Sequence, residues 1–376
     1  MWYCNAVYFA GEEGFVRGSF CVEDGKFTHI SRDDFPPGSE KECMDLHGNN
    51  VIPGLVDIHV HGAMGDDFSD GRKEGLISMA RCLLGQGTTS FMPTSMTLPY
   101  ERLEKAFRTA AEVKEEAPEG AARIIGIHME GPFLSERKCG AQNRDYLKLP
   151  DTEAFRSLQE QCGNLVRIVD VAPELKGAVS FAKEASKLCR VSAAHTAADY
   201  EEAHRFFEAG AGHLTHLFNA MTPVHHRDPG VIGAASERGK VTAELICDGL
   251  HVHPAAVKMA FKLFPGRICL ITDALRCMGM PEGYYELGGQ KVRLDGGAAR
   301  LEDGTLAGAA SSLFQDMKNA ILYGVPAGEA INAATINPAR AAGWDDRIGS
   351  IEEGKYADFL ICDKNLNLKQ VVAGHS

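Results

Sequence analysis

Histidines and carboxylates stand at the ends of several short apolar runs in this sequence, and these residue types are the usual ligands of catalytic divalent metals. His59 and His61 close one run, Glu130 closes another, and His195 and His216 close two more. Because side chains in a strand alternate faces, His59 and His61 point to the same side and both can bind one ion. Each residue alone fits a structural role equally well. Together, Glu130, His195 and His216 form the N and O ligand set of a zinc or similar site.

Asp273 ends a further apolar run, directly after Leu270–Thr272. An unpaired carboxylate is costly in such surroundings. The position therefore predicts either a metal or a proton-transfer role beside one. The alternative is a cap for the turn that follows.

These residues need elements that bring their ends together. Between Val51 and about residue 275 the sequence holds eight short runs rich in β-branched residues, separated mostly by amphipathic stretches of helical periodicity. The runs are 51–60, 88–92, 123–129, 166–171, 190–194, 213–217, 241–247 and 267–272. Eight β-α units predict a closed (β/α)8 TIM-like barrel of the α/β class, with its active site at the carboxyl ends of the strands. An open doubly wound sheet is the alternative, but no Gly-x-Gly-x-x-Gly or P-loop motif follows any run.

Both ends of the chain are β-rich. We expect residues 1–50 and 345–376 to form one small, discontinuous β-sandwich domain. Residues 51–344 would then form the metal-dependent barrel. Glycine turns predict a β-hairpin insertion near residues 283–306.

Charge and cysteine content exclude several functions. Across 376 residues, 39 Lys and Arg stand against 51 Asp and Glu, so the formal net charge is 39 − 51 = −12. This balance disfavours nucleic acid and membrane partners. The eleven cysteines are an odd number without a CxxC pair, which predicts reduced thiols. With no signal peptide or membrane span in the sequence, we expect a cytoplasmic protein.

Longer motifs add a resemblance that covers most of the chain. The sequence resembles the N-acetylglucosamine-6-phosphate deacetylases of the amidohydrolase superfamily. The selective motifs are Glu-Gly-Pro-Phe at 130–133, Asn-Ala-Met at 219–221 and Asp-Gly-Leu-His at 248–251. Pro-Gly-Leu-Val-Asp-Ile-His-Val-His at 53–61 and the segment 349–358 are shared across many amidohydrolases and identify only the superfamily.

The resemblance implies release of acetate from a small phosphorylated amino sugar. It places the principal metal on Glu130, His195 and His216, and assigns His59 and His61 to a second position that only some members fill. Zinc is expected, with iron or manganese as alternatives, in one or two ions. Asp273 would accept the proton of the attacking water and pass it to the departing amine.

Phosphate recognition would fall to a second set of residues. The resemblance assigns this role to Asn219, the backbone amide of Ala220, Arg227 and His251. Groups matching Arg227 and His251 typically come from the neighbouring subunit of the family, which implies a homodimer with a shared site.

One position departs from the family pattern. Members usually carry Gly-Ala-His after the Glu-Gly-Pro-Phe motif, where this chain has Gly140-Ala141-Gln142. We expect Gln142 to bind substrate, although an uncharged amide would leave more of the carbonyl activation to the metal.

Three other functions stay open. The chain could deacetylate another N-acyl phosphosugar, act as a cyclic amidase or deaminase, or be a non-catalytic barrel scaffold. Many cyclic amidases bridge two metals with a lysine from the fourth strand, and the fourth run has none. A scaffold predicts missing ligands, yet every candidate ligand is present.

Overall fold

The barrel predicted from the eight apolar runs is present in the computed structural model, which describes residues 1–37, 39 and 43–374. Parallel pairing joins the strands in the order β6, β9, β11, β12, β13, β14, β15 and β16. A short strand, β10 (Arg123–Ile124), also pairs with β9 just before the third barrel strand. The barrel strands are β6 (Leu55–Val60), β9 (Thr88–Ser95), β11 (Ile127–Phe133), β12 (Val166–Val171), β13 (Arg190–Ala193), β14 (His213–Leu214), β15 (Thr242–Ile246) and β16 (Ile268–Ile271).

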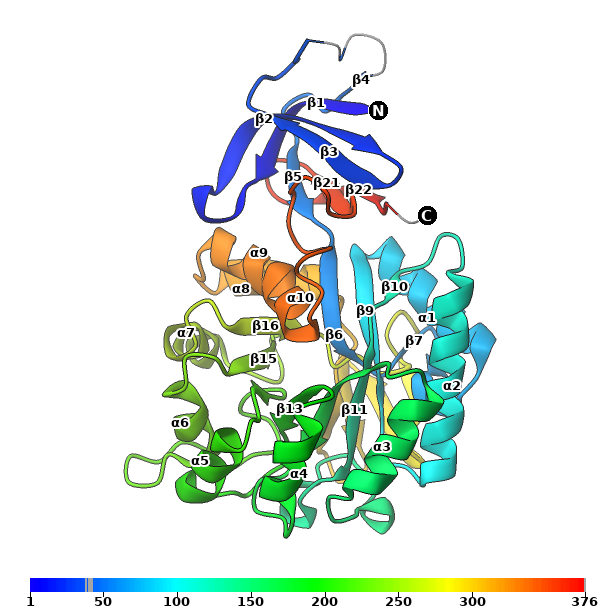
Figure 1. Cartoon of the computed structure of the whole chain (residues 1–376), viewed down its shortest axis with the longest axis vertical. Helices are drawn as coiled ribbons and strands as arrows, with labels where there is room; N and C mark the ends of the chain where they lie inside the picture. The colour runs from blue at the N-terminus through cyan, green and yellow to red at the C-terminus, as the bar shows by residue number, and fades with distance from the viewer. Residues whose placement is uncertain (38, 40–42, 375–376) are drawn as a thin grey trace.

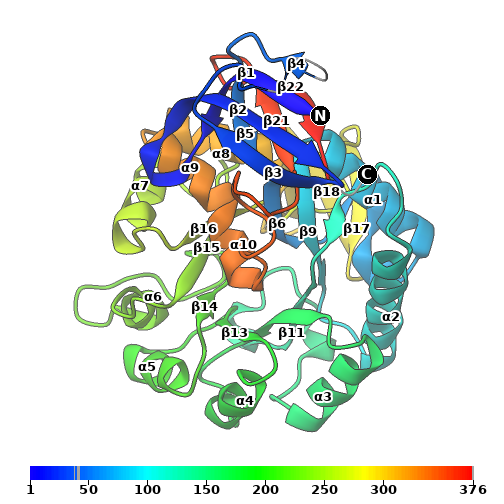
Figure 2. The same ribbon diagram turned by 45° about the horizontal axis from the view of Figure 1, so that its top comes forward.

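Helices surround this ring of strands, as Figure 2 shows. Most of them alternate with the strands along the chain, so each returns the chain to the start of the next parallel strand. They are α1 (Lys73–Gly85), α2 (Tyr100–Glu116), α3 (Thr152–Gln161), α4 (Ala178–Ala185), α5 (Tyr200–Glu208), α6 (Gly230–Ser236), α7 (Pro254–Leu263), α8 (Leu313–Leu322), α9 (Ala327–Ala334) and α10 (Ile336–Ala342). Asp199 caps the start of α5 and forms a capping box with Glu202.

The ring closes between its first and last strands through backbone contacts at their carboxyl ends. A parallel bridge joins Val60 to Ala274, and the backbone N–H of Asp273 donates to the carbonyl oxygen of His59 at 2.9 Å. The buried carboxylate of Asp57 supplements it, because its Oδ2 accepts a hydrogen bond from Thr272 Oγ1 at 2.6 Å while its Oδ1 accepts one from the backbone N–H of His59 at 3.2 Å. The closure therefore fixes the backbone on both sides of the predicted site residues.

The two ends of the chain share one seven-stranded sheet at one end of the molecule (Figure 1). Phe20, Phe27 and Phe359 are fully buried in its core, with Phe20 centred 5.5 Å from Phe27 and 5.1 Å from Phe359. The chain passes from β5 directly into β6. Strand β6 runs away from the terminal sheet, so the carboxyl end of β6 lies on the side of the barrel that faces away from this sheet (Figure 1). The strands are β1 (Trp2–Phe9), β2 (Phe15–Glu23), β3 (Lys26–Ser31), β4 (Cys43–Asp45), β5 (Asn50–Pro53), β21 (Phe359–Cys362) and β22 (Leu368–Val372).

The predicted hairpin insertion is a four-stranded antiparallel sheet. Its last strand lies next to the barrel, because Ala309, just after it, forms a bridge to Ala274. This contact brings the end of the insertion to the mouth of the barrel. The strands are β17 (Gly283–Leu287), β18 (Gln290–Asp295), β19 (Ala298–Leu301) and β20 (Leu306–Gly308). A two-stranded ribbon, β7 (Gly62–Ala63) with β8 (Asp66–Asp67), follows β6.

One expectation about the cysteines is wrong. The structure joins Cys4 to Cys43 in a disulfide, with Cα atoms 6.2 Å apart. The two residues lie on β1 and β4, which pair in parallel and hold these side chains close together. Residue spacing alone did not reveal this strand pairing. The other nine cysteines are free. Among the described residues, no helix combines the length and apolar character that crossing a membrane requires.

Candidate active site

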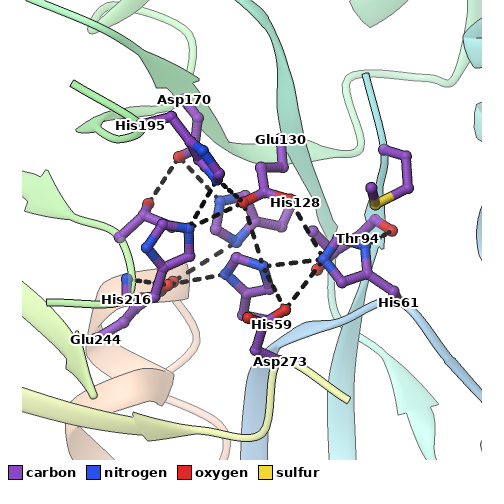
Figure 3. Close-up of polar contacts among 12 residues, drawn as sticks. His59, His61, Thr94, His128, Glu130, Asp170, His195, His216, Glu244 and Asp273 are labelled. Carbon is purple, nitrogen blue, oxygen red and sulfur yellow. Dashed lines mark hydrogen bonds and ion pairs between the residues drawn. The ribbon is translucent and has the colours of Figure 1, made fainter. Parts of the chain in front are cut away.

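Glu130, His195 and His216 meet at the carboxyl-terminal mouth of the barrel, although they come from three different strand ends (Figure 3). Glu130 Oε1 lies 3.0 Å from His195 Nε2 and 3.0 Å from His216 Nε2. The two Nε2 atoms are 3.1 Å apart. Donors bound tetrahedrally to one zinc ion at ~2.1 Å lie about 3.4 Å from each other, so this triangle is close to a metal-ligand set.

His59 and His61 lie beside this triangle, and their Nε2 atoms are 3.3 Å apart. His61 Nε2 lies 3.3 Å from Glu130 Oε2 and 3.2 Å from Asp273 Oδ1. His59 Nε2 lies 3.6 Å from the same oxygen of Asp273. Glu130 thus faces the first group through Oε1 and the second through Oε2. The structure brings all five predicted ligands and Asp273 together, and their binding of an ion stays a prediction.

The hydrogen bonds behind these histidines favour a metal. His195 Nδ1 lies 2.8 Å from the carbonyl oxygen of Lys138, and His61 Nδ1 lies 3.1 Å from that of Thr94. A carbonyl oxygen only accepts, so each Nδ1 carries the hydrogen and each Nε2 presents either a lone pair or a second proton. This backing by a carbonyl is typical of histidines that bind metals. In contrast, the buried His216 Nδ1 has no hydrogen-bond partner among the residues that the structure describes.

Glu244, in the middle of β15, lies beneath the candidate ligands and accepts hydrogen bonds from them and from His213. Its Oε2 accepts a hydrogen bond from His59 Nδ1 at 2.9 Å and its Oε1 accepts one from His213 Nε2 at 3.0 Å. The backbone N–H of His216 also donates to Oε2 at 3.2 Å. Since Nδ1 of His59 carries the hydrogen that Glu244 accepts, Nε2 on the other side of the ring is the atom that faces the predicted ion. All of these side chains are buried.

Electrostatics show how strongly these groups interact. Burial alone would raise the pKa of Glu130, but hydrogen bonds with His195, His216 and His61 outweigh burial and hold this pKa well below its usual value. Burial alone would lower the pKa of His216, but the hydrogen bond to Glu130 raises it to about 9. Likewise, the pKa of His61 rises well above its usual value against the effect of burial, because Asp273 and Glu130 accept its hydrogen bonds. Without an ion, these histidines therefore hold protons.

The backbone at the strand ends takes costly conformations. His195, His216 and Asp273 have φ values of 42°, 29° and 52°, in a region that side-chain-bearing residues seldom adopt. Such strain is concentrated at functional sites. Gly131, directly after Glu130, has a φ of 80°, and a Cβ atom there would collide with Thr97 Oγ1. Glycine is therefore required next to the carboxylate.

A cavity of about 360 Å³ opens above these groups. Of the predicted phosphate contacts, Asn219, Ala220 and His251 line it, while Arg227 is exposed and does not. His251 Nδ1 lies 2.6 Å from Asp248 Oδ2. His251 therefore reaches the cavity of its own chain, whereas the family pattern implied that it serves the neighbouring subunit.

Gln142 lines the same cavity, but its amide is engaged with the protein. Its Oε1 accepts a hydrogen bond from the backbone N–H of Thr97 at 2.7 Å. Its Nε2 donates to Glu130 Oε2 at 2.6 Å. The predicted substrate contact thus holds a predicted metal ligand.

Several residues of the site escaped sequence reasoning. Three of them lie inside an apolar run or at its start: Glu244, His213 and His128. The feature that could have revealed them is a titratable residue within a run that otherwise has the pattern of a buried strand. Arg137 and Lys138 line the cavity beside the 305–308 segment of the insertion. Arg137 and Lys138 lie between the Glu-Gly-Pro-Phe motif and Gln142, but nothing in their own spacing marked them.

The fold and the site define a (β/α)8-barrel enzyme with a candidate metal centre at the mouth of the barrel. A model described as the amidohydrolase family matches residues 50–277 and 292–374, and the chain belongs to that family. It is 38% identical over 353 residues to an N-acetylglucosamine-6-phosphate deacetylase from Bacillus subtilis (strain 168), a match that covers 92% of this chain and 88% of that one. An N-acetylgalactosamine-6-phosphate deacetylase from Escherichia coli O157:H7 is 35% identical, with 85% of each chain covered.

Solved structures agree with these matches. The structure of a variant N-acetyl-D-glucosamine-6-phosphate deacetylase from Mycobacterium smegmatis, in complex with N-acetyl-D-glucosamine-6-phosphate, superposes with a TM-score of 0.92 at 28% identity. It covers 100% of this chain and 98% of that one. A Thermotoga maritima N-acetylglucosamine-6-phosphate deacetylase superposes with a TM-score of 0.89 at 29% identity, over 100% and 99% of the two chains.

Proposed function

We propose that this chain hydrolyses N-acetylglucosamine 6-phosphate to glucosamine 6-phosphate and acetate. The observation that carries the proposal is the triangle of Glu130, His195 and His216, next to Asp273 and open to a cavity of substrate size. The similarity to deacetylases over almost the whole chain supports the same substrate class.

Glu130, His195 and His216 would hold a divalent ion, with His59 and His61 available for a second. Zinc is our first choice, and iron or manganese would accept the same ligands. An ion bound there lowers the pKa of a water molecule and polarises the amide carbonyl of the substrate.

The remaining chemistry belongs to side chains of this protein. Asp273, whose side chain is 14% exposed and borders the cavity, accepts a proton from the attacking water. The water oxygen forms a bond to the acetyl carbon, and the C–N bond breaks as Asp273 returns that proton to the amine nitrogen. The second proton of the water passes from the new carboxyl group to the amine, so the products are acetate and the ammonium form of the sugar amine, and atoms and charge balance.

The phosphate would bind at the end of the cavity lined by Asn219, Ala220 and His251. His251 is held by Asp248, which orients the free Nε2 of the imidazole. Arg137 and Lys138 add positive charge at the same mouth in a chain of net charge −12. We include Arg227 as a contact to a partner subunit in a homodimer, because its loop is exposed and does not line the cavity of its own chain.

A phosphate ester of this kind crosses membranes poorly, and nine cysteines are free, so we place the enzyme in the cytoplasm. We also propose the boundaries 1–50 with 345–376 for the small β-domain and 51–344 for the barrel, because the terminal strands share one sheet.

The test is acetate release from three substrates, the 6-phosphates of N-acetylglucosamine, N-acetylgalactosamine and N-acetylmannosamine, with elemental analysis of the purified protein. The proposal expects the highest kcat/KM for the glucosamine derivative, bound metal, and loss of turnover on chelation. A higher kcat/KM for N-acetylgalactosamine 6-phosphate would mean that the substrate is the one named for the Escherichia coli relative. Undiminished turnover after complete removal of metal would refute the reaction scheme.

A further inference from the structure

Gln142 stands where the family pattern described above has a histidine, and its contacts differ from those of a substrate ligand. The side chain is only 5% exposed. Both ends of the amide bind the protein, through the backbone N–H of Thr97 and through Glu130.

The orientation of this amide is fixed by its partners. The backbone N–H of Thr97 can only donate, so the atom 2.7 Å from it must be the Gln142 oxygen. The amide nitrogen then faces Glu130 Oε2 at 2.6 Å and donates a hydrogen bond to this carboxylate oxygen. Exchanging the two amide atoms would place donor against donor and acceptor against acceptor.

Glu130 contacts three histidines of the site at once. Its Oε1 faces His195 and His216, and its Oε2 faces His61 at 3.3 Å. If the carboxylate rotated about its last bond, both sets of distances would be lost. The Gln142 amide is the group at 2.6 Å that opposes this rotation, and its own anchor is the backbone N–H of Thr97, two residues after the end of β9.

From these contacts we infer that Gln142 is a positioning residue for Glu130. It holds the carboxylate so that each oxygen faces one of the two histidine pairs. It does not supply the hydrogen bond that polarises the substrate carbonyl, so that task stays with the ion. This inference rests on the proposed function, because it assigns Glu130 to a metal.

The experiment compares Gln142→Met with the parent protein and with Asn219→Ala. Methionine has a similar volume but removes both hydrogen bonds, whereas Asn219 lines the cavity without touching Glu130. Zinc affinity is measured by competition with a chromophoric chelator, and kcat and KM are measured with saturating metal. Thermal unfolding with and without zinc confirms that each variant is folded.

Loss of a hydrogen bond behind a metal ligand weakens metal binding by ~10–100-fold, and we expect Gln142→Met to fall in this range. Its KM at saturating metal should stay within about threefold of the parent value, while Asn219→Ala should raise KM and keep the parent zinc affinity. Gln142→Glu, which keeps the acceptor for Thr97 but removes the donor to Glu130, should also alter zinc affinity and serves as a second variant if Gln142→Met fails to fold.

Unchanged zinc affinity in both Gln142 variants, with a raised KM, would overturn the inference and restore Gln142 as a substrate contact. That result would leave the proposed function intact. A parent protein that binds no zinc, iron or manganese would overturn the proposed function together with the inference.

Discussion

Metal binding at this site should be strongly pH-dependent, because the ion must displace protons. The hydrogen bond to Glu130 raises the pKa of His216 to about 9, although burial opposes this rise. Below that pH the ion-free protein carries a proton on the nitrogen that would bind the metal. Affinity should therefore rise with pH and level off above about 9.

The size of this effect on metal affinity follows from the difference between the pKa of His216 and the pH of the assay. At pH 7, two units below the pKa, only ~1% of His216 is unprotonated, which weakens apparent affinity by about 100-fold, or ~2.7 kcal/mol. The pKa of His61 is also raised. If His61 binds the same ion or a second one, metal binding releases a second proton. We expect apparent affinity to change by one to two log units per pH unit between about pH 6 and 8.

Calorimetric titration of the ion-free protein with zinc, in two buffers of different ionisation enthalpy, counts the protons released. We expect at least one per ion at pH 7. His47→Gln is the matched control, because His47 is exposed in the loop after β4 and its loss should leave the count unchanged. Release of less than about half a proton per ion would mean that Glu130 does not hold the histidines protonated, and the electrostatic account of the site would be refuted.

Three further predictions address catalysis, positioning and the terminal sheet. Asp273→Asn should lower kcat by ~10²–10⁴-fold in steady-state assays while the protein keeps a bound ion, and near-parental kcat would remove Asp273 from proton transfer. Glu174→Ala should cost about 1–3 kcal/mol in urea unfolding, because Glu174 accepts hydrogen bonds from Thr196 Oγ1 and Ala197 N that hold the loop after His195; a stability change within error would contradict this role. Phe20→Ala should cost about 3–5 kcal/mol in the same assay, with kcat preserved, because its ring is fully buried far from the cavity; a loss of kcat in the folded variant would contradict that separation.

The barrel was predictable because its signal is repeated. Eight apolar runs of strand length, each followed by polar residues, leave few other arrangements. The sixth run shows the limit of this reasoning, because the sequence predicts a strand over 213–217 and the structure ends β14 at Leu214. His216 and Phe218 have φ values of 29° and 78°, and such conformations persist only when surrounding contacts enforce them.

The clustering of the candidate ligands was predictable for a similar reason, since these residues lie at strand ends. The anchoring of Gln142 was not predictable, because its partner Thr97 contributes a backbone N–H, which every residue except proline possesses. The disulfide between Cys4 and Cys43 also depends on a strand pairing that residue spacing does not reveal. Contacts made by backbone atoms, or between strands distant in sequence, leave little trace in residue types.

Buried carboxylates and histidines lie beneath the candidate metal ligands. His128 Nδ1 lies 3.0 Å from the carbonyl oxygen of Ile58, and its Nε2 lies 3.0 Å from Asp170 Oδ1. Both partners accept, so His128 is an imidazolium, in agreement with a pKa that Asp170 and Glu244 raise to about 9 against the effect of burial. One cation thus faces two buried carboxylates, since the pKa of Glu244 lies well below its usual value despite burial, because His59, His128 and His213 stabilise its charge. Glu244 lies below His59, where a low dielectric strengthens its attraction for a cation bound above.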